Sequence, residues 1–100
     1  MIINTTFHVS PEAEEEFKTW IHESYIPHAL DKGQLHSPLF MRIMTPMEGG
    51  TGYALQLRAA ADRIVEQWLN THQPVMLQDM LNKWGQGVMF FTTLMEEVEK

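Results

Sequence analysis

The residues best suited to chemistry in this 100-residue chain lie in apolar, strand-like segments. His8 follows Asn4 and Thr6 at two-residue spacing, and its imidazole titrates near neutral pH, where it can serve as a general base. Arg42 and Arg58 could hold an anionic group through paired hydrogen bonds. The residues expected to line a ligand site are Asn4, Thr6, His8, Arg42, Gln56 and Arg58. A hydrogen-bonded spacer role for His8 and inter-subunit ion pairs for the arginines stay open as alternatives.

Other catalytic and metal-binding patterns are missing from the sequence. Residues 22–26 begin as His-Glu but lack the second histidine of H-E-x-x-H, and His8, His28 and His36 form no ligand pair at i, i+4. The glycine-rich residues 49–52 lack the lysine of a phosphate-binding loop and read as a hairpin turn. We therefore predict neither a metal nor a cofactor.

Hydrophobic periodicity predicts the elements that must position these residues. Residues 1–9, 35–45, 52–59 and 88–98 have the composition of strands. A helix should follow Ser10 as its cap and Pro11 as its first residue, with a break near Pro27. A second helix should begin near Ala61, break or kink at Pro74 and end before the glycines at 85 and 87.

The resulting order, βαββαβ, predicts an α+β ferredoxin-like fold for a single domain spanning residues 1–100. Such a domain has a four-stranded antiparallel sheet with strand order 4-1-3-2 and two helices on one face. The central strands of the sheet would then be the first and third in sequence.

Alternation along the strands divides their side chains between the two faces of this sheet. The set expected to lie under the helices is Ile3, Phe7, Val9, Leu39, Met41, Ile43, Tyr53, Leu55, Leu57, Val88, Phe90 and Leu94. The opposite face would carry the six polar candidates on a polar floor with apolar walls. Its large apolar residues are expected to form a dimer interface, and they are Phe40, Met44, Met89, Phe91 and Met95.

The whole chain resembles the dimeric α/β-barrel superfamily of ferredoxin-like proteins. It is most similar to a small domain-of-unknown-function family, at residues 1–4, at 20–30 with Tyr25-Ile26-Pro27, at 53–56 and at His72-Gln73-Pro74. The resemblance implies a homodimer in which two sheets face each other, with a cavity bounded either by each subunit's sheet and helices or by both subunits together. It assigns no catalytic residue.

The same superfamily includes antibiotic-biosynthesis monooxygenases and heme-degrading enzymes. Heme-degrading members typically use an Asn on the first strand, a Trp near the cavity and a His on the second helix, and Asn4, Trp68 and His72 supply these types. This chain departs from the pattern of the heme-degrading enzymes, because Trp68 lies on the same predicted helix as His72, four residues away. Heme degradation is therefore not the favoured function.

The composition of the chain indicates which binding partners and which cellular compartment to expect. The net charge is −6 and residues 14–16 are all glutamate, which disfavours contacts with a phosphate backbone, so no nucleic-acid partner is expected. The sequence has no cysteine, no signal-peptide pattern and no long apolar run. We expect a cytoplasmic protein without a membrane partner.

Two functions remain. The favoured one is a homodimeric protein that binds a small molecule in a sheet-lined cavity. The alternative is an enzyme resembling a cofactor-independent monooxygenase or isomerase, in which His8, Arg42 and Arg58 act on an aromatic or acidic substrate.

Overall fold

The computed structural model describes residues 1–99. Its strands are β1 (Ile2–Val9), β2 (His36–Arg42), β3 (Thr51–Arg58) and β4 (Val88–Met95). Its helical segments are α1 (Glu14–Trp20), η1 (Ile21–Tyr25), α2 (Ile26–Asp31), α3 (Asp62–Gln67), η2 (Trp68–His72), α4 (Gln73–Trp84) and η3 (Gly85–Gly87). The predicted βαββαβ order is confirmed.

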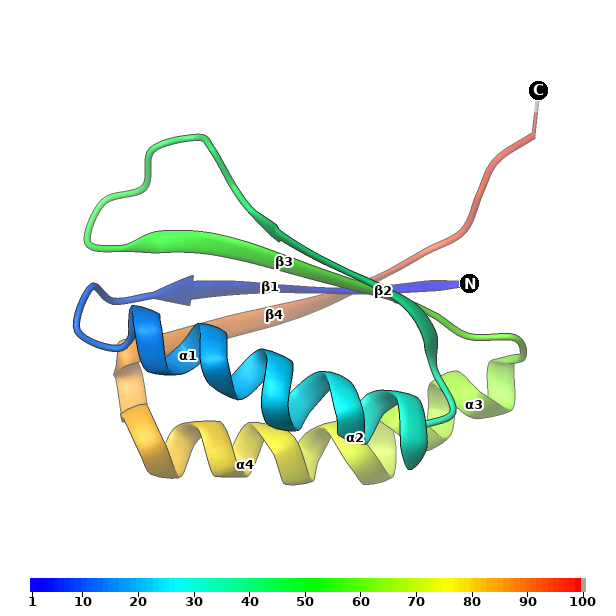
Figure 1. The fold of residues 1–100 in the computed structure, drawn as a ribbon. Coiled ribbons are helices and arrows are strands. Elements are labelled where there is room, and N and C mark those ends of the chain that lie inside the picture. Colours follow the sequence, from blue (N-terminus) through cyan, green and yellow to red (C-terminus); the bar gives the residue numbers. More distant parts are fainter. Residues whose placement is uncertain (100) are drawn as a thin grey trace.

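The four strands form one antiparallel sheet in the order β2-β3-β1-β4, which is the predicted arrangement. The helices form a layer on one side of this sheet (Figure 1). On the other side, the β2–β3 connection and the C-terminal segment rise away from the sheet (Figure 1). We call the sheet surface on this second side the open face.

Two strands end earlier than predicted. β2 ends at Arg42, after which one backbone bond joins the Ile43 N–H to the Gly52 carbonyl oxygen at 2.8 Å. β4 ends at Met95 because Met95 pairs with Ile2, the first residue of β1. Beyond Met95, β1 therefore offers no further ladder partner, whereas β2 leaves the sheet before it reaches the Thr51 end of β3.

The first helix begins later than predicted, and Ser10 is not its side-chain cap. Residues 10–13 form a turn in which the Ala13 N–H donates to the Ser10 carbonyl oxygen at 3.1 Å, and α1 starts at Glu14 without a side-chain cap. The backbone N–H of Ser10 donates to Gly87 at 2.8 Å, which ties the end of β1 to the start of β4. Ser10 therefore joins two strands through its backbone.

Neither proline breaks its helix. A π-helical turn precedes each one, closed by hydrogen bonds from Ile26 N–H to Ile21 O and from Gln73 N–H to Trp68 O. A proline ring clashes with the carbonyl four residues earlier in an α-helix, and a wider turn relieves that clash. The predicted breaks at Pro27 and Pro74 are therefore replaced by π turns within continuous helices.

The core lies between the sheet and the helices. The buried side chains include most of the predicted set on β1, β3 and the start of β4, namely Ile3, Phe7, Val9, Tyr53, Leu55, Leu57 and Val88. Phe90 and Leu94 point the same way but stay exposed, because β4 is an edge strand. The helices contribute large buried residues, among them Phe17, Tyr25 and Trp68.

The predicted orientation of the β2 side chains relative to the two faces of the sheet is wrong. His36 pairs with Arg58 and Leu39 pairs with Gln56, so three steps along β2 match two along β3. This bulge contains Ser37, whose φ is 56°. One extra residue exchanges the two faces of a strand, and Leu39 and Met41 are accordingly 57% and 40% exposed.

Phe40 consequently faces the helices rather than the open face. Its ring stacks on Tyr53, with centroids 5.3 Å apart and an interplanar angle of 17°. It also lies 6.2 Å from the ring of Phe17 on α1. Phe40 is thus part of the core margin, and its prediction as an interface residue is wrong.

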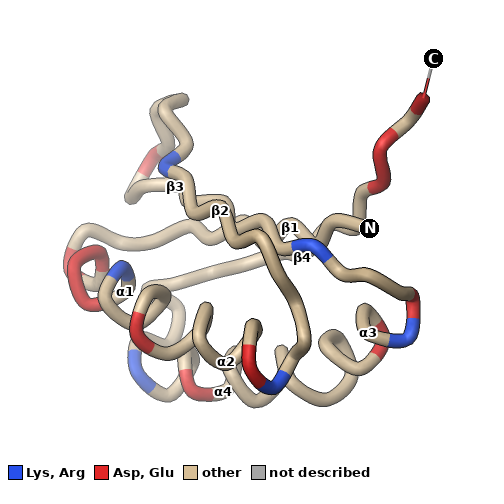
Figure 2. Tube along the Cα trace, turned by 45° about the vertical axis from the view of Figure 1, so that its right-hand side comes forward, with Lys and Arg blue, Asp and Glu red and all other residues tan. Residues whose placement is uncertain are grey.

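Charged residues are concentrated away from the middle of the sheet. Figure 2 shows acidic and basic positions on the helices, at strand ends and along the C-terminal segment. β1 and β4 contain no Lys, Arg, Asp or Glu. Within residues 1–99, none of the helices has the length and apolar character required to cross a bilayer.

Candidate ligand site on the open face

The centre of the open face is polar and its edges are apolar, as predicted. Alternate β1 residues form its midline, and each has one neighbour on β3 and one on β4. Across the sheet, the rows are Gln56–Asn4–Thr93, Ala54–Thr6–Phe91 and Gly52–His8–Met89. On the β2 edge, Leu39 and Met41 continue the first two rows.

A hollow of about 330 Å³ lies at the His8 end of this face. Its lining consists of Thr6, Phe7, His8, Met47, Met89, Phe90 and Phe91. Ligand sites in proteins are typically concave, largely apolar and equipped with a few polar groups. This hollow therefore brings together two predicted ligand residues, Thr6 and His8, and two predicted interface residues, Met89 and Phe91.

The β2–β3 connection forms one wall of the hollow because two glycines admit it. A Cβ placed on Gly50 would lie 2.3 Å from the Val9 carbonyl oxygen, and one on Gly52 would lie 2.8 Å from the Met47 sulfur. Only glycine permits the close approach of residue 50 to the β1 backbone, whereas at residue 52 the contact is with the end of a flexible side chain. Met47 thus lies over Gly52, beside His8 in the cross-strand row.

His8 is held by this connection. Its Nε2 lies 3.1 Å from the backbone carbonyl oxygen of Glu48. A carbonyl oxygen only accepts hydrogen bonds, so Nε2 carries the proton and donates it, and Nδ1 of the neutral ring keeps a lone pair. The arrangement fixes the tautomer in a side chain that lines the hollow.

Asn4 and Gln56 continue the polar midline beyond the hollow. Asn4 Nδ2 donates to Thr6 Oγ1 at 3.2 Å. Gln56 lies directly opposite Asn4 on β3. These two predicted ligand residues share the face of Thr6 and His8, although they do not line the hollow itself.

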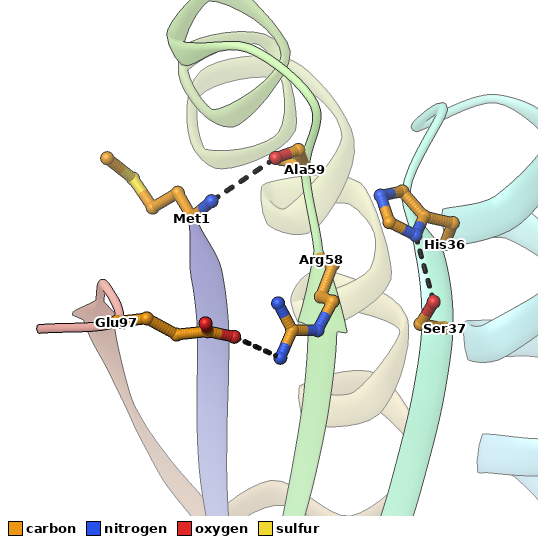
Figure 3. A network of polar contacts seen from close by, with 6 residues as sticks. All are labelled: Met1, His36, Ser37, Arg58, Ala59 and Glu97. Atoms are coloured by element: carbon orange, nitrogen blue, oxygen red, sulfur yellow. Dashed lines mark hydrogen bonds and ion pairs between the residues drawn. The ribbon is translucent and has the colours of Figure 1, made fainter. Parts of the chain in front are cut away.

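Arg58 lies at the far end of the same face. It pairs with Ile2, six residues along β1 from His8, or about 20 Å at the rise of a strand. Glu97 reaches across β1 to it, and Arg58 Nη2 lies 2.9 Å from Glu97 Oε1 (Figure 3). The predicted partnership of Arg58 with His8 around one anion is therefore wrong in geometry.

Arg42 lies on the helix-facing side, since the bulge in β2 also inverts its orientation. It pairs with Tyr53, whose hydroxyl donates to Glu14 Oε2 at 2.7 Å. That hydrogen bond holds the pKa of Glu14 below its usual value, and Arg42 adds a smaller effect in the same direction. The prediction of Arg42 on the open face is wrong.

The predicted interface residues separate into two groups. Met89, Phe91 and Met95 share the open face with β1, whereas Phe40 faces the helices and Met44 lies in the connection after β2. The sequence reasoning missed Leu39, Met41 and Met47 on the open side. Pro38 in the middle of a predicted strand was the available signal, because proline within a sheet is confined to edges and bulges.

The predicted space between sheet and helices is filled by side chains. Phe7, Phe17, Tyr25 and Trp68 are each 0% exposed there. Asn4, Trp68 and His72 do not form a common site, since Asn4 is on the open face whereas the Trp68 and His72 rings stack in the helical layer, 6.2 Å apart. The geometry of a heme-degrading site is not reproduced.

A larger groove, about 430 Å³, lies outside the helices between α1 and α4. It is wide open to solvent, and its walls include Glu15, Glu16 and Glu23. The indole N–H groups of its tryptophans are already engaged, Trp20 with Asp79 at 2.8 Å and Trp84 with Glu16 at 3.4 Å. We favour the smaller hollow because it is less open to solvent than the groove, has apolar walls and contains an imidazole nitrogen that is not committed to a hydrogen bond.

Two solved structures share the fold over nearly the whole chain. A candidate antibiotic biosynthesis monooxygenase from Deinococcus radiodurans covers 100% of this chain and 97% of its own, at a TM-score of 0.68 and 11% identity. An ethyl tert-butyl ether D (EthD) family protein from Bacillus halodurans covers 96% of this chain and 99% of its own length, with a TM-score of 0.66 and 13% sequence identity. Both likenesses bear on the fold alone, and they agree with the predicted ferredoxin-like arrangement.

Sequence comparison identifies the family without supplying an activity. No curated protein matches the chain. The model of DUF4286, a domain of unknown function, matches residues 1–98. The chain belongs to the DUF4286 family.

Proposed function

We propose that this protein is a homodimer that packs its open sheet faces together and binds a small molecule in the hollow over Thr6 and His8. The observation that carries the proposal is the position of this hollow within an exposed apolar surface. Leu39, Met41, Met89 and Phe91 are all exposed on that surface. Contiguous apolar patches of this kind mark interfaces or ligand sites.

The size of the open face suits a second copy of the chain. Four strands of about eight residues cover roughly 19 by 26 Å, or about 500 Å² in projection. Two copies would bury about 1,000 Å² in total, the lower limit for a specific interface. The rising β2–β3 connection and C-terminal segment would add to this area (Figure 1). The dimeric α/β-barrel proteins provide a precedent for the packing.

Dimerisation would convert the hollow from an open depression into an enclosed site. In the single chain its apolar walls Met89 and Phe91 are exposed to water. A partner sheet would cover them, exclude water and strengthen any hydrogen bond to His8. Ligand binding and association would therefore reinforce each other.

The test compares two substitutions at equally exposed apolar positions. Phe91 on the open face is 61% exposed and Val75 on the outer side of α4 is 60% exposed. By sedimentation equilibrium, we expect Phe91→Asp to give a folded monomer and Val75→Asp to remain a dimer. A monomeric wild type, or a dimeric Phe91→Asp protein, would refute the face-to-face assembly. Native mass spectrometry of freshly purified wild type should show the dimer with retained extra mass.

A second candidate function is an enzyme of the cofactor-independent monooxygenase kind. The observation that favours it is the fixed His8 tautomer, which leaves the lone pair of Nδ1 available as a base in a side chain that lines the hollow. The retained molecule would be incubated aerobically with wild type and with His8→Phe. A mass change that requires His8 would support catalysis, whereas an unchanged molecule would leave the binding function.

A further inference from the structure

We propose that the hollow selects an uncharged, flat apolar molecule that presents one hydroxyl group to His8 and Thr6. This inference rests on the proposed function, since it specifies the ligand of the same site. It differs from the sequence-based expectation of an acidic ligand held by two arginines.

The charge distribution disfavours an anion. None of the seven lining residues is Lys, Arg, Asp or Glu. Arg58 lies about 20 Å from His8 along the sheet and is paired with Glu97, while Arg42 lies on the opposite face. An anion enclosed here would lose its hydration without gaining a cationic partner, which is strongly unfavourable.

The walls of the hollow favour a flat apolar body. Phe91 and Met89 stand on β4, and Met47 stands over β3, so the walls lie two strand spacings apart, or about 10 Å between backbones. The hollow between these walls has a volume of about 330 Å³, at the small end of the range of ligand sites in proteins. Thioethers make favourable contacts with aromatic rings, and Phe91 adds an aromatic surface.

The polar groups define the complementary group on the ligand. His8 Nε2–H is committed to the Glu48 carbonyl oxygen, so Nδ1 can only accept a hydrogen bond. Thr6 Oγ1 already accepts from Asn4 Nδ2, and its own proton remains available for donation. A hydroxyl group satisfies both by donating to His8 and accepting from Thr6, whereas a carboxylate cannot donate.

The experiment uses three probes with the same ring system: 1-naphthol, 1-naphthoate and naphthalene. Isothermal titration of the wild-type dimer should show 1-naphthol binding at least tenfold more tightly than either of the others. His8→Phe keeps a ring but removes the acceptor, so its affinity for 1-naphthol should fall about tenfold, toward that for naphthalene. His36→Phe, at an exposed position on β2 outside the hollow, is the matched control and should bind like wild type.

Light scattering on each protein separates this inference from the proposed function. A dimer that prefers 1-naphthoate, that binds none of the probes, or whose His8→Phe variant binds 1-naphthol unchanged would overturn the ligand class while leaving the assembly intact. A monomeric wild type would instead refute the proposed function. Thermal melts of both variants verify that each is folded.

Discussion

At the scale of single residues, a polar cluster in the interior is centred on Gln73, and two of its hydroxyls, those of Thr5 and Thr92, also lie 3.2 Å from each other. Gln73 Nε2 lies within hydrogen-bond distance of Thr5 Oγ1 at 3.2 Å, Tyr25 OH at 3.2 Å and Thr92 Oγ1 at 3.1 Å. The cluster links both sets of helices to β1 and β4. Burial raises the pKa of Tyr25 to about 12, so its phenol stays protonated in the cluster.

Replacing Gln73 with Leu should destabilise the protein by about 2 kcal/mol, because the buried Tyr25 hydroxyl would lose its partner while Thr5 and Thr92 would keep only each other. Urea denaturation provides the measurement. Gln78→Leu is the matched control, since Gln78 is exposed and its side-chain amide donates to Asn82 on the surface of the same helix. Equal stabilities of the two variants would show that the Gln73 cluster contributes nothing.

His28 should make stability depend on pH. Burial, with a smaller contribution from His72, lowers the pKa of His28 below its usual 6.5, and its Nε2 has no hydrogen-bond partner among the described residues. Lys32 acts in the same direction and Asp31 opposes it. The unfolded chain therefore binds the proton more readily, so the stabilisation is complete above pH 6.5 and is lost as the pH falls through the folded pKa.

The free energy of unfolding should accordingly be lower at pH 5 than at pH 7.5, and His28→Gln should reduce that difference. Denaturant titrations at the two pH values measure it. His36→Gln, at an exposed histidine bonded to Ser37, should keep the wild-type difference. If His28→Gln kept the wild-type difference between the two pH values, His28 would not be the source of the pH dependence.

At the scale of elements, the bulge in β2 decides which residues belong to the core and which to the open face. Ser37 adopts a positive φ and Pro38 cannot donate to a ladder, so the regular pairing is interrupted between His36 and Leu39. Both π turns have a comparable origin, since a proline determines the local geometry of each. These three irregularities leave the order of the elements intact.

Adjacent residues of β2 should therefore respond differently to the same substitution. Phe40→Asp would place a carboxylate against Phe17 and Tyr53 and should cost about 3 kcal/mol of stability. Met41→Asp changes only the open face, so it should weaken dimerisation while leaving the unfolding of the monomer nearly unchanged. Denaturation measures the stability of the two variants and sedimentation measures their dimerisation. If Met41→Asp lost stability and Phe40→Asp only weakened dimerisation, β2 would have the regular, unbulged pairing.

At the scale of the whole molecule, one face of the sheet is covered by helices, and no element within residues 1–99 covers the other. The covered face holds the buried aromatic core, and the open face carries the hollow and its apolar borders. A second copy covering that face should couple folding to association.

The melting temperature of the wild type should then rise with protein concentration, by about 4 °C for each tenfold increase for a dimer of this size. Differential scanning calorimetry over a hundredfold range measures this shift. The Val75→Asp protein should behave like wild type, and Phe91→Asp should melt at one temperature throughout. Concentration-independent melting of the wild type would argue for a folded monomer.

The sequence by itself determined the order of the elements, the strand order and the polar midline of the open face. These depend on local periodicity, which is regular along β1 and β3, so that His8, Thr6, Asn4 and Gln56 lie on the predicted side. The alternation along β4 is equally regular, so Met89 and Phe91 lie beside His8 and Thr6 on the open face.

Only the tertiary structure decided which polar residues can act together. The orientations of Phe40 and Arg42 depend on one extra residue in β2, and a single-residue slip reverses every later side chain. Arg58 shares a face with His8, yet the length of the strand separates them, and Met47 reaches the hollow only because Gly50 and Gly52 let its connection fold back over β1. Such long-range contacts have no periodic signature, because they arise from how the folded chain fills space.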